Sequence, residues 1–198
     1  MSPERNLDDA LEIYRALILC RDEAMDCVRR DPGPFSRKFA EAVNAGRPLK
    51  GEPRNFFETF FDMRVTPTLY EVCFLDIVRI FEFMVFEMVK EASGNIKNIV
   101  RDPRSAKKTK FPFQSYADKF VKERGGDIHG PGDLRNLGDV KEILKGRLHQ
   151  RLYDGLDAIV TYRNWLAHGN RFSGRPRHPG DLQDVVRLLN DILSEIKE

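Results

Sequence analysis

The chain has 198 residues, of which 41% are hydrophobic and 32% are charged, and its formal net charge at pH 7 is +2. A chain of this length can bury a sizeable core as one globular domain. The nearly balanced charge excludes binding of a polyanion through bulk charge, so any contact with nucleic acid would depend on local basic patches.

The cysteines and the N-terminus indicate a cytoplasmic protein. Cys20, Cys27 and Cys73 form an odd set without a Cys-x-x-Cys pair, which is typical of a reducing compartment. Because Cys20 and Cys27 are seven residues apart on one helical face, we expect them to be core thiols. The first residues carry acids where a signal peptide has its apolar core, and no apolar run approaches the ~20 residues of a membrane span. We therefore expect no association with a membrane.

Apolar residues at three- and four-residue spacing predict a succession of helices. The expected long helices span about 7–30, 66–92 and 146–167, with a last one from about 181. The expected short helices cover about 35–44, 55–63, 113–124 and 133–145. Asp31-Pro32-Gly33-Pro34 should end the first helix, and Thr66 with Pro67 can begin the long central helix. Residues 94–112 are expected to form a loop.

No segment of any length has the two-residue period of a strand, so the sequence predicts an all-α fold. Four long helices with short ones between them favour an up-down helical bundle. We expect a single domain over residues 1–198 with insertions at about 35–64 and 94–145. Those insertions are where substrate or partner contacts would be expected.

The end of the third long helix carries an arginine, an amide and a histidine within six residues, in the sequence Arg163-Asn164-Trp165-Leu166-Ala167-His168-Gly169. No other stretch of the chain brings together so many groups that can hold a phosphate or transfer a proton. Leu156 and Ile159 belong to an apolar stripe, and Arg163 is its next member, so the guanidinium should point toward the interior. An arginine stays charged in any protein environment, and burying it without a partner is costly. Arg163 therefore needs an anion.

Glu82 offers that anion from the central helix, where it interrupts an otherwise apolar seam. The simplest hypothesis pairs Glu82 with Arg163, either directly or through a bound phosphate. Two other readings stay open: a structural ion pair that fixes the register of two helices, or a glutamate that leans out to water.

These residues together resemble the HEPN superfamily of small helical bundles, whose shared pattern is an arginine, four to six residues, and a histidine. Here the pattern is Arg163, four residues and His168, with the polar Asn164 after the arginine and Phe81-Glu82 in the preceding core helix. The resemblance implies a metal-independent endoribonuclease that needs no cofactor and leaves a 2′,3′-cyclic phosphate and a 5′-hydroxyl. It also implies a toxin–antitoxin or phage-defence context, in which an antitoxin protein could be a partner. Because many members have lost activity, the alternative is a non-catalytic module that binds RNA, a nucleotide or a protein.

The motif residues suit that chemistry independently of the family resemblance. An unperturbed imidazole titrates near pH ~6.5, so His168 can give or take a proton. Arg163 can donate two hydrogen bonds to phosphate oxygens, and Asn164 can orient the histidine or the substrate. Gly169 is placed to end the helix in a left-handed conformation, which would swing His168 toward the site. The alternative is that His168 only caps carbonyl groups at the helix end.

One motif supplies one histidine, whereas cleavage beside a ribose needs an acid and a base. A two-fold dimer would bring two copies of Arg163 and His168 into one cleft, and such dimers are the commonest closed assemblies. The sequence therefore predicts a homodimer with a composite site.

The segment after the motif predicts an RNA-binding surface. It carries a basic and aromatic set without any acid, namely Arg171, Phe172, Arg175, Arg177 and His178. Phe172 could stack on a base. A second segment, 101–124, has eight lysines or arginines against three acids and holds several aromatic residues, which suits single-stranded RNA. The alternatives are a solvated charge run for the first segment and core packing for the aromatic residues of the second.

Other sites are not favoured by the sequence. His129 lies near Asp127 and Asp133 in a glycine-rich loop, but such loops usually bind no metal, so we expect none. The chain has no phosphate-binding loop, no dinucleotide-binding glycine pattern and no nucleophile elbow.

Overall fold

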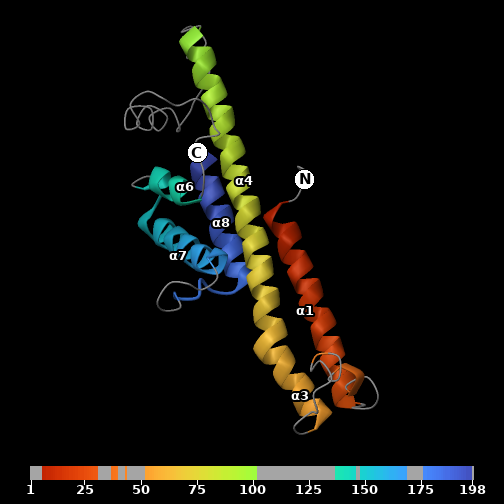
Figure 1. The fold of residues 1–198 in the computed structure, drawn as a ribbon. Coiled ribbons are helices and arrows are strands. Elements are labelled where there is room, and N and C mark those ends of the chain that lie inside the picture. The colour runs from red at the N-terminus through yellow and green to blue at the C-terminus, as the bar shows by residue number, and fades with distance from the viewer. Residues whose placement is uncertain are drawn as a thin grey trace. The chain divides into compact units, whose positions relative to one another are not determined.

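The computed structural model is all-α, as the sequence predicts, and the part of the chain that it describes contains no strand (Figure 1). It describes residues 6–30, 37–39, 43, 52–101, 137–145, 148–168 and 176–197. The elements in chain order are α1 (Leu7–Arg30), α3 (Pro53–Phe60), the π-helix η1 (Phe61–Val65), α4 (Thr66–Arg101), α6 (Leu137–Leu144), α7 (Gln150–Ala167) and α8 (Leu182–Lys197).

The chain divides into two compact units, Met1–Asp76 and Ile77–Glu198, and α4 runs across the boundary. The expectation of one domain over the whole chain stays a prediction. All the residues proposed for the RNA site belong to the second unit. The expected helix over 113–124 and the His129 loop lie outside the described residues.

The central helix begins at Thr66 as predicted, but Thr66 does not cap a free helix start, and the helix runs beyond its predicted end. Because α3, η1 and α4 follow one another without a break, Thr66 itself has helical dihedral angles, φ −60° and ψ −49°. Its hydroxyl instead accepts a hydrogen bond of 2.9 Å from Nη1 of Arg21. At the other end, α4 continues to Arg101 through the start of the expected 94–112 loop. Pro103, which cannot sit inside a helix without breaking a hydrogen bond, follows soon after.

In the first unit, α1 and α3 share a small core in which Met25, Val28 and Phe57 are buried. The Phe57 ring stacks on that of Phe61 with 4.4 Å between centroids, and the Phe39 ring packs edge-on against Phe57 at 4.8 Å. Aromatic pairs of this kind add to the burial of their area. The core therefore joins the aromatic helix α3 to the C-terminal half of α1.

The expectation that Cys20 and Cys27 are core thiols is wrong, since both are exposed. The buried side of α1 carries Leu7, Leu11, Met25 and Val28. The two cysteines lie roughly 130° away from it around the helix axis, because successive residues are rotated by about 100°. Cys73 in α4 is buried, and this burial raises the pKa of its thiol, with a smaller contribution from Asp76.

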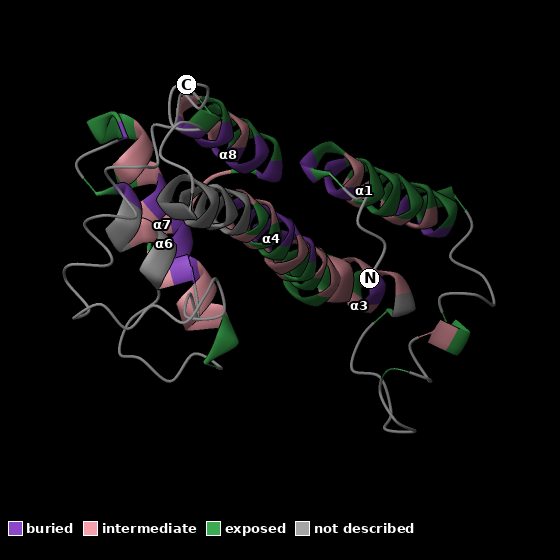
Figure 2. Ribbon diagram, turned by 90° about the horizontal axis from the view of Figure 1, so that it is seen from above, coloured by how far each residue is buried: buried purple, intermediate pink, exposed green. Residues whose placement is uncertain are grey.

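The second unit has a larger core, built around α8. Figure 2 shows buried positions along α8. The buried residues of this helix lie one, three or four positions apart, namely Leu182, Val185, Val186, Leu189, Ile192, Leu193 and Ile196. α7 approaches α8 closely at Gly155, where an added Cβ would lie 2.5 Å from Cδ2 of Leu188. A glycine at this position lets the two helices pack together, since any larger residue would meet that leucine.

Polar contacts fix α7 between its neighbours. The backbone N–H of His149, just before α7, donates to Oε1 of Glu195 in α8 at 2.8 Å. This carboxylate satisfies one of the free donors at the start of a helix and lies at the positive end of the helix dipole. Nζ of Lys141 in α6 also lies 2.6 Å from Oδ1 of Asp157 in α7. The helix that carries the Arg-His motif is therefore anchored at its start and along one side.

Candidate functional site

The apolar stripe of α7 places Arg163 as the sequence predicts. Leu156 and Ile159 are buried, and Arg163 follows them on the same face with 28% of its side chain exposed. Its guanidinium therefore lies at the edge of the core, where it can reach both a buried partner and solvent.

Glu82 is that partner, and its ion pair with Arg163 confirms the predicted pairing. Oε2 of Glu82 lies 3.6 Å from Nη2 of Arg163, and only 14% of the glutamate side chain is exposed. Its neighbours Val78, Phe81 and Val85 on α4 are buried. In such apolar surroundings a carboxylate needs a cation, and the guanidinium supplies it. The reading in which Glu82 leans out to water is excluded.

Asn164 completes a three-residue cluster. Nη1 of Arg163 donates to Oδ1 of Asn164 at 3.2 Å, so the amide and the carboxylate hold two different nitrogens of one guanidinium. The carbonyl group of Asn164 accepts the backbone N–H of His168 at 3.0 Å. Asn164 therefore orients Arg163 through its side chain and the end of α7 through its backbone.

His168 lies at the C-terminal end of α7. It is exposed and directly follows the last helical residue, with φ −93° and ψ 14°. The predicted left-handed residue, Gly169, lies outside the described residues. Along α7, Arg163 and His168 emerge about 140° apart around the helix axis, because successive residues are rotated by about 100°. The structure thus brings Glu82, Arg163 and Asn164 together, whereas the side chain of His168 leaves the backbone on another side of the helix.

An aromatic cluster on α7 was missed by the sequence reasoning. The ring of Tyr162, which is completely buried, stacks on that of Trp165 with 5.7 Å between centroids and 30° between planes. His178, predicted to contact RNA, packs edge-on against the same tyrosine at 5.3 Å. The three-residue spacing of Tyr162 and Trp165 was the available signal, since such residues are neighbours on a helix. Nothing in the sequence indicated that His178 returns to α7.

The rest of the predicted RNA surface is described only in part. Arg177 is exposed, beside His178. Arg171, Phe172 and Arg175 lie outside the described residues, as does almost all of the second basic segment.

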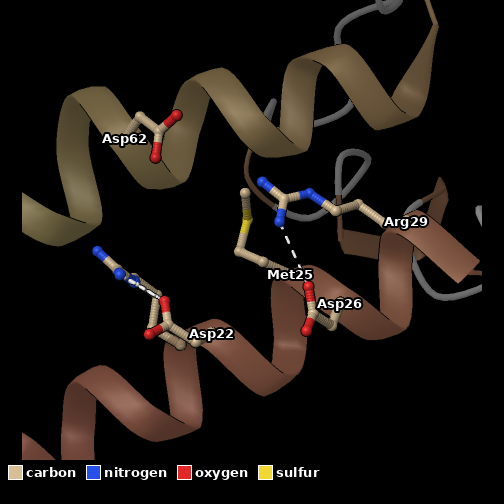
Figure 3. Close-up of a pocket in the computed structure, with 6 residues that line it drawn as sticks. Asp22, Met25, Asp26, Arg29 and Asp62 are labelled. Atoms are coloured by element: carbon tan, nitrogen blue, oxygen red, sulfur yellow. Dashed lines mark hydrogen bonds and ion pairs between the residues drawn. The ribbon is translucent and has the colours of Figure 1, made fainter.

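A cavity of about 300 Å³ lies in the first unit between α1 and η1, a place that the sequence did not indicate (Figure 3). It is lined by Arg21, Asp22, Met25, Asp26, Arg29 and Asp62. Arg21 forms an ion pair with Asp22, and Nη1 of Arg29 lies 3.3 Å from Oδ1 of Asp26. These two pairs join four of the five charged side chains that line the cavity.

Within the described ranges, no group of three or more His, Cys, Asp and Glu side chains is arranged to hold a metal ion. Among the helices of those ranges, none combines the length and the apolar composition that a membrane crossing requires.

Comparison of the chain with protein-family models, with curated proteins and with solved structures gave no match.

Proposed function

We propose that the protein is a metal-independent endoribonuclease in which Arg163 binds the scissile phosphate and His168 transfers a proton. The resemblance to the HEPN pattern suggested this activity. The observation that carries the proposal is the ion pair of Arg163 with Glu82, because it orients a guanidinium that is still 28% exposed and so accessible to a phosphate. A purely structural pair would be served as well by a fully buried guanidinium.

The reaction needs no cofactor. The ribose 2′-hydroxyl attacks the adjacent phosphorus while a base accepts its proton, and the bond from phosphorus to the 5′-oxygen breaks as an acid protonates that oxygen. The products are a 2′,3′-cyclic phosphate and a 5′-hydroxyl. Imidazole can serve as the base or as the acid, and a guanidinium can stabilise the charge that develops on the phosphoryl oxygens.

The geometry of α7 supports a site shared by two copies of the chain. Because Arg163 and His168 emerge on different sides of one helix, a phosphate held by one guanidinium would receive its imidazole more readily from a second protomer. Two copies also supply the two imidazoles that acid and base catalysis require. We therefore propose a two-fold homodimer, the commonest closed assembly, in which Arg163 of one protomer acts with His168 of the other.

An RNA digestion in the presence of EDTA tests this function. The wild type should cut RNA and leave cyclic phosphate ends, and His168→Ala should lower the rate by about 10²-fold or more, the usual contribution of a positioned acid or base. His149→Ala is the matched control, because His149 is an exposed histidine at the other end of α7 whose side chain makes no cap hydrogen bond. Equal cleavage by both variants would contradict the proposal.

A second function is favoured by the same ion pair. Glu82 already satisfies the charge of Arg163, as in a pair that only fixes helix register. The chain would then be a non-catalytic module that binds RNA, a nucleotide or a protein such as an antitoxin. If wild type and His168→Ala are equally inert but bind RNA with equal affinity, the module replaces the nuclease. A toxin–antitoxin or phage-defence role would be compatible with either function.

A further inference from the structure

Trp165 is the single tryptophan of the chain, and it lies inside the Arg-His motif. It stacks on Tyr162, whose ring is completely buried, so the indole rests on a fixed support. Trp165 itself is only partly buried. An indole with accessible area that is held by a rigid aromatic ring can receive another planar ring at little cost in conformational entropy.

Two groups that suit RNA lie near Tyr162, the ring on which this indole stacks. His178 contacts the same tyrosine ring and is itself exposed, and Arg177 precedes it with an exposed side chain. His168 is the residue three positions after Trp165, so the two side chains are neighbours on the helix surface. Aromatic rings next to positive charge are the usual surface for single-stranded nucleic acid.

We propose that Trp165 and His178 form a stacking surface for an unpaired nucleobase, which places the adjoining ribose beside His168. The inference rests on RNA being the ligand, as in the proposed function, and it specifies the substrate class as single-stranded RNA. Duplex RNA is excluded because its bases are already stacked on one another. The surface accepts any base, since every base has a π-face.

The emission of Trp165 reports this contact directly. A 2′-O-methyl RNA oligonucleotide about ten nucleotides long, within the site sizes of single-strand binders, has no free 2′-hydroxyl and so cannot be cut. Titrating it into the wild-type protein at fixed salt should quench the tryptophan emission. The same oligonucleotide in duplex form, and an abasic oligonucleotide of equal length, should leave the emission nearly unchanged although they carry the same phosphates.

Variants separate stacking from folding. Trp165→Leu keeps an apolar side chain but removes the ring, and we expect about tenfold weaker binding of the oligonucleotide, measured by fluorescence anisotropy of a labelled strand. Trp165→Phe keeps a π-face and should bind nearly as tightly as the wild type. Phe83→Leu, which removes an exposed aromatic residue on α4, is the matched control and should leave affinity unchanged.

The outcomes distinguish this inference from the nuclease proposal. Quenching by the single strand, without any cleavage of ordinary RNA, supports the stacking surface and contradicts the nuclease. Cleavage without quenching supports the nuclease and overturns the stacking surface. If Trp165→Leu and Trp165→Phe bind equally well, the ring has no stacking role. If RNA leaves the tryptophan emission unchanged while Trp165→Leu changes the oligomeric mass, the indole belongs to a protein interface and the inference is wrong.

Discussion

Removing either partner of the pair between Glu82 and Arg163 should destabilise the protein, and the two losses should not add. The side chains are 3.6 Å apart. At that distance the Coulomb attraction is about 5 kcal/mol for an effective dielectric constant near 20. Desolvation and the partial exposure of both groups oppose it. The pair lies between surface ion pairs, which contribute ~1 kcal/mol or less, and fully buried ones, where losing one partner costs about 3–5 kcal/mol.

We therefore expect Glu82→Gln and Arg163→Met each to lower the free energy of unfolding by about 1–3 kcal/mol, with a coupling of about 1–2 kcal/mol between them. Methionine keeps the apolar stem of the arginine, so the loss reports the charge and its hydrogen bonds. Urea unfolding followed by the emission of Trp165, the only tryptophan, measures each variant.

The exposed pair of Asp184 and Arg187 in α8 is the matched control. It has a shorter distance, 3.2 Å, but the two side chains are 59% and 65% exposed. Its double-mutant cycle should give a coupling of about 0.5 kcal/mol or less. Additive effects at Glu82 and Arg163, within about 0.5 kcal/mol, would refute the reasoning that burial strengthens this pair and that it holds the guanidinium in place.

Three further predictions concern other parts of the chain. A thiol reagent should modify Cys20 and Cys27 quickly in the native protein and Cys73 only on unfolding, because Cys73 is buried and its pKa is raised; fast reaction of all three would contradict this. Glu58 accepts hydrogen bonds from two arginines, first of all Arg29, and its pKa is lowered. The stabilising effect of the Glu58 carboxylate should be present above the ordinary glutamate pKa of about 4.3 and disappear as the pH falls through the lower pKa of the folded state. The melting temperatures of wild type and Glu58→Gln should therefore remain apart at pH 7 and converge at acid pH. Gly155→Ala adds helix propensity of about 1 kcal/mol but brings a methyl group to 2.5 Å from a leucine of α8, which costs about 1–3 kcal/mol. We therefore expect a slightly lower melting temperature. A clearly higher melting temperature would contradict the close packing of α7 and α8.

The periodic features of this chain could be predicted from its sequence. The bounds of the first helix agree with the structure at both ends, and the motif helix ends at Ala167 as expected. The pairing of Glu82 with Arg163 was predictable because each charged residue interrupts an apolar stripe, and each stripe must face a core. The spacing of residues along one helix shows which face each side chain is on, so this pairing could be predicted without knowing how the helices are arranged.

Features that depend on what covers a surface could not be predicted in the same way. Cys20 and Cys27 share a helical face, but the sequence does not show which face of α1 finds a partner. The π-helix η1 joins α3 to α4 where the sequence predicted two separate helices. The contact of His178 with Tyr162 depends on a return of the chain that no periodicity encodes.

Mixing the wild type with an inactive variant tests the central claim most directly, namely that the imidazoles of two protomers serve one RNA-cleaving site. His168→Ala should fail to cut RNA in EDTA. After equal amounts of the two proteins are unfolded together and refolded, about a quarter of the dimers are wild-type and about half are mixed, and each mixed dimer holds one imidazole where acid and base catalysis require two. The mixture should therefore keep about a quarter of the activity of the same total amount of wild type. About half of that activity, which is the result for protomers that act independently, would contradict the claim when both proteins refold and dimerise.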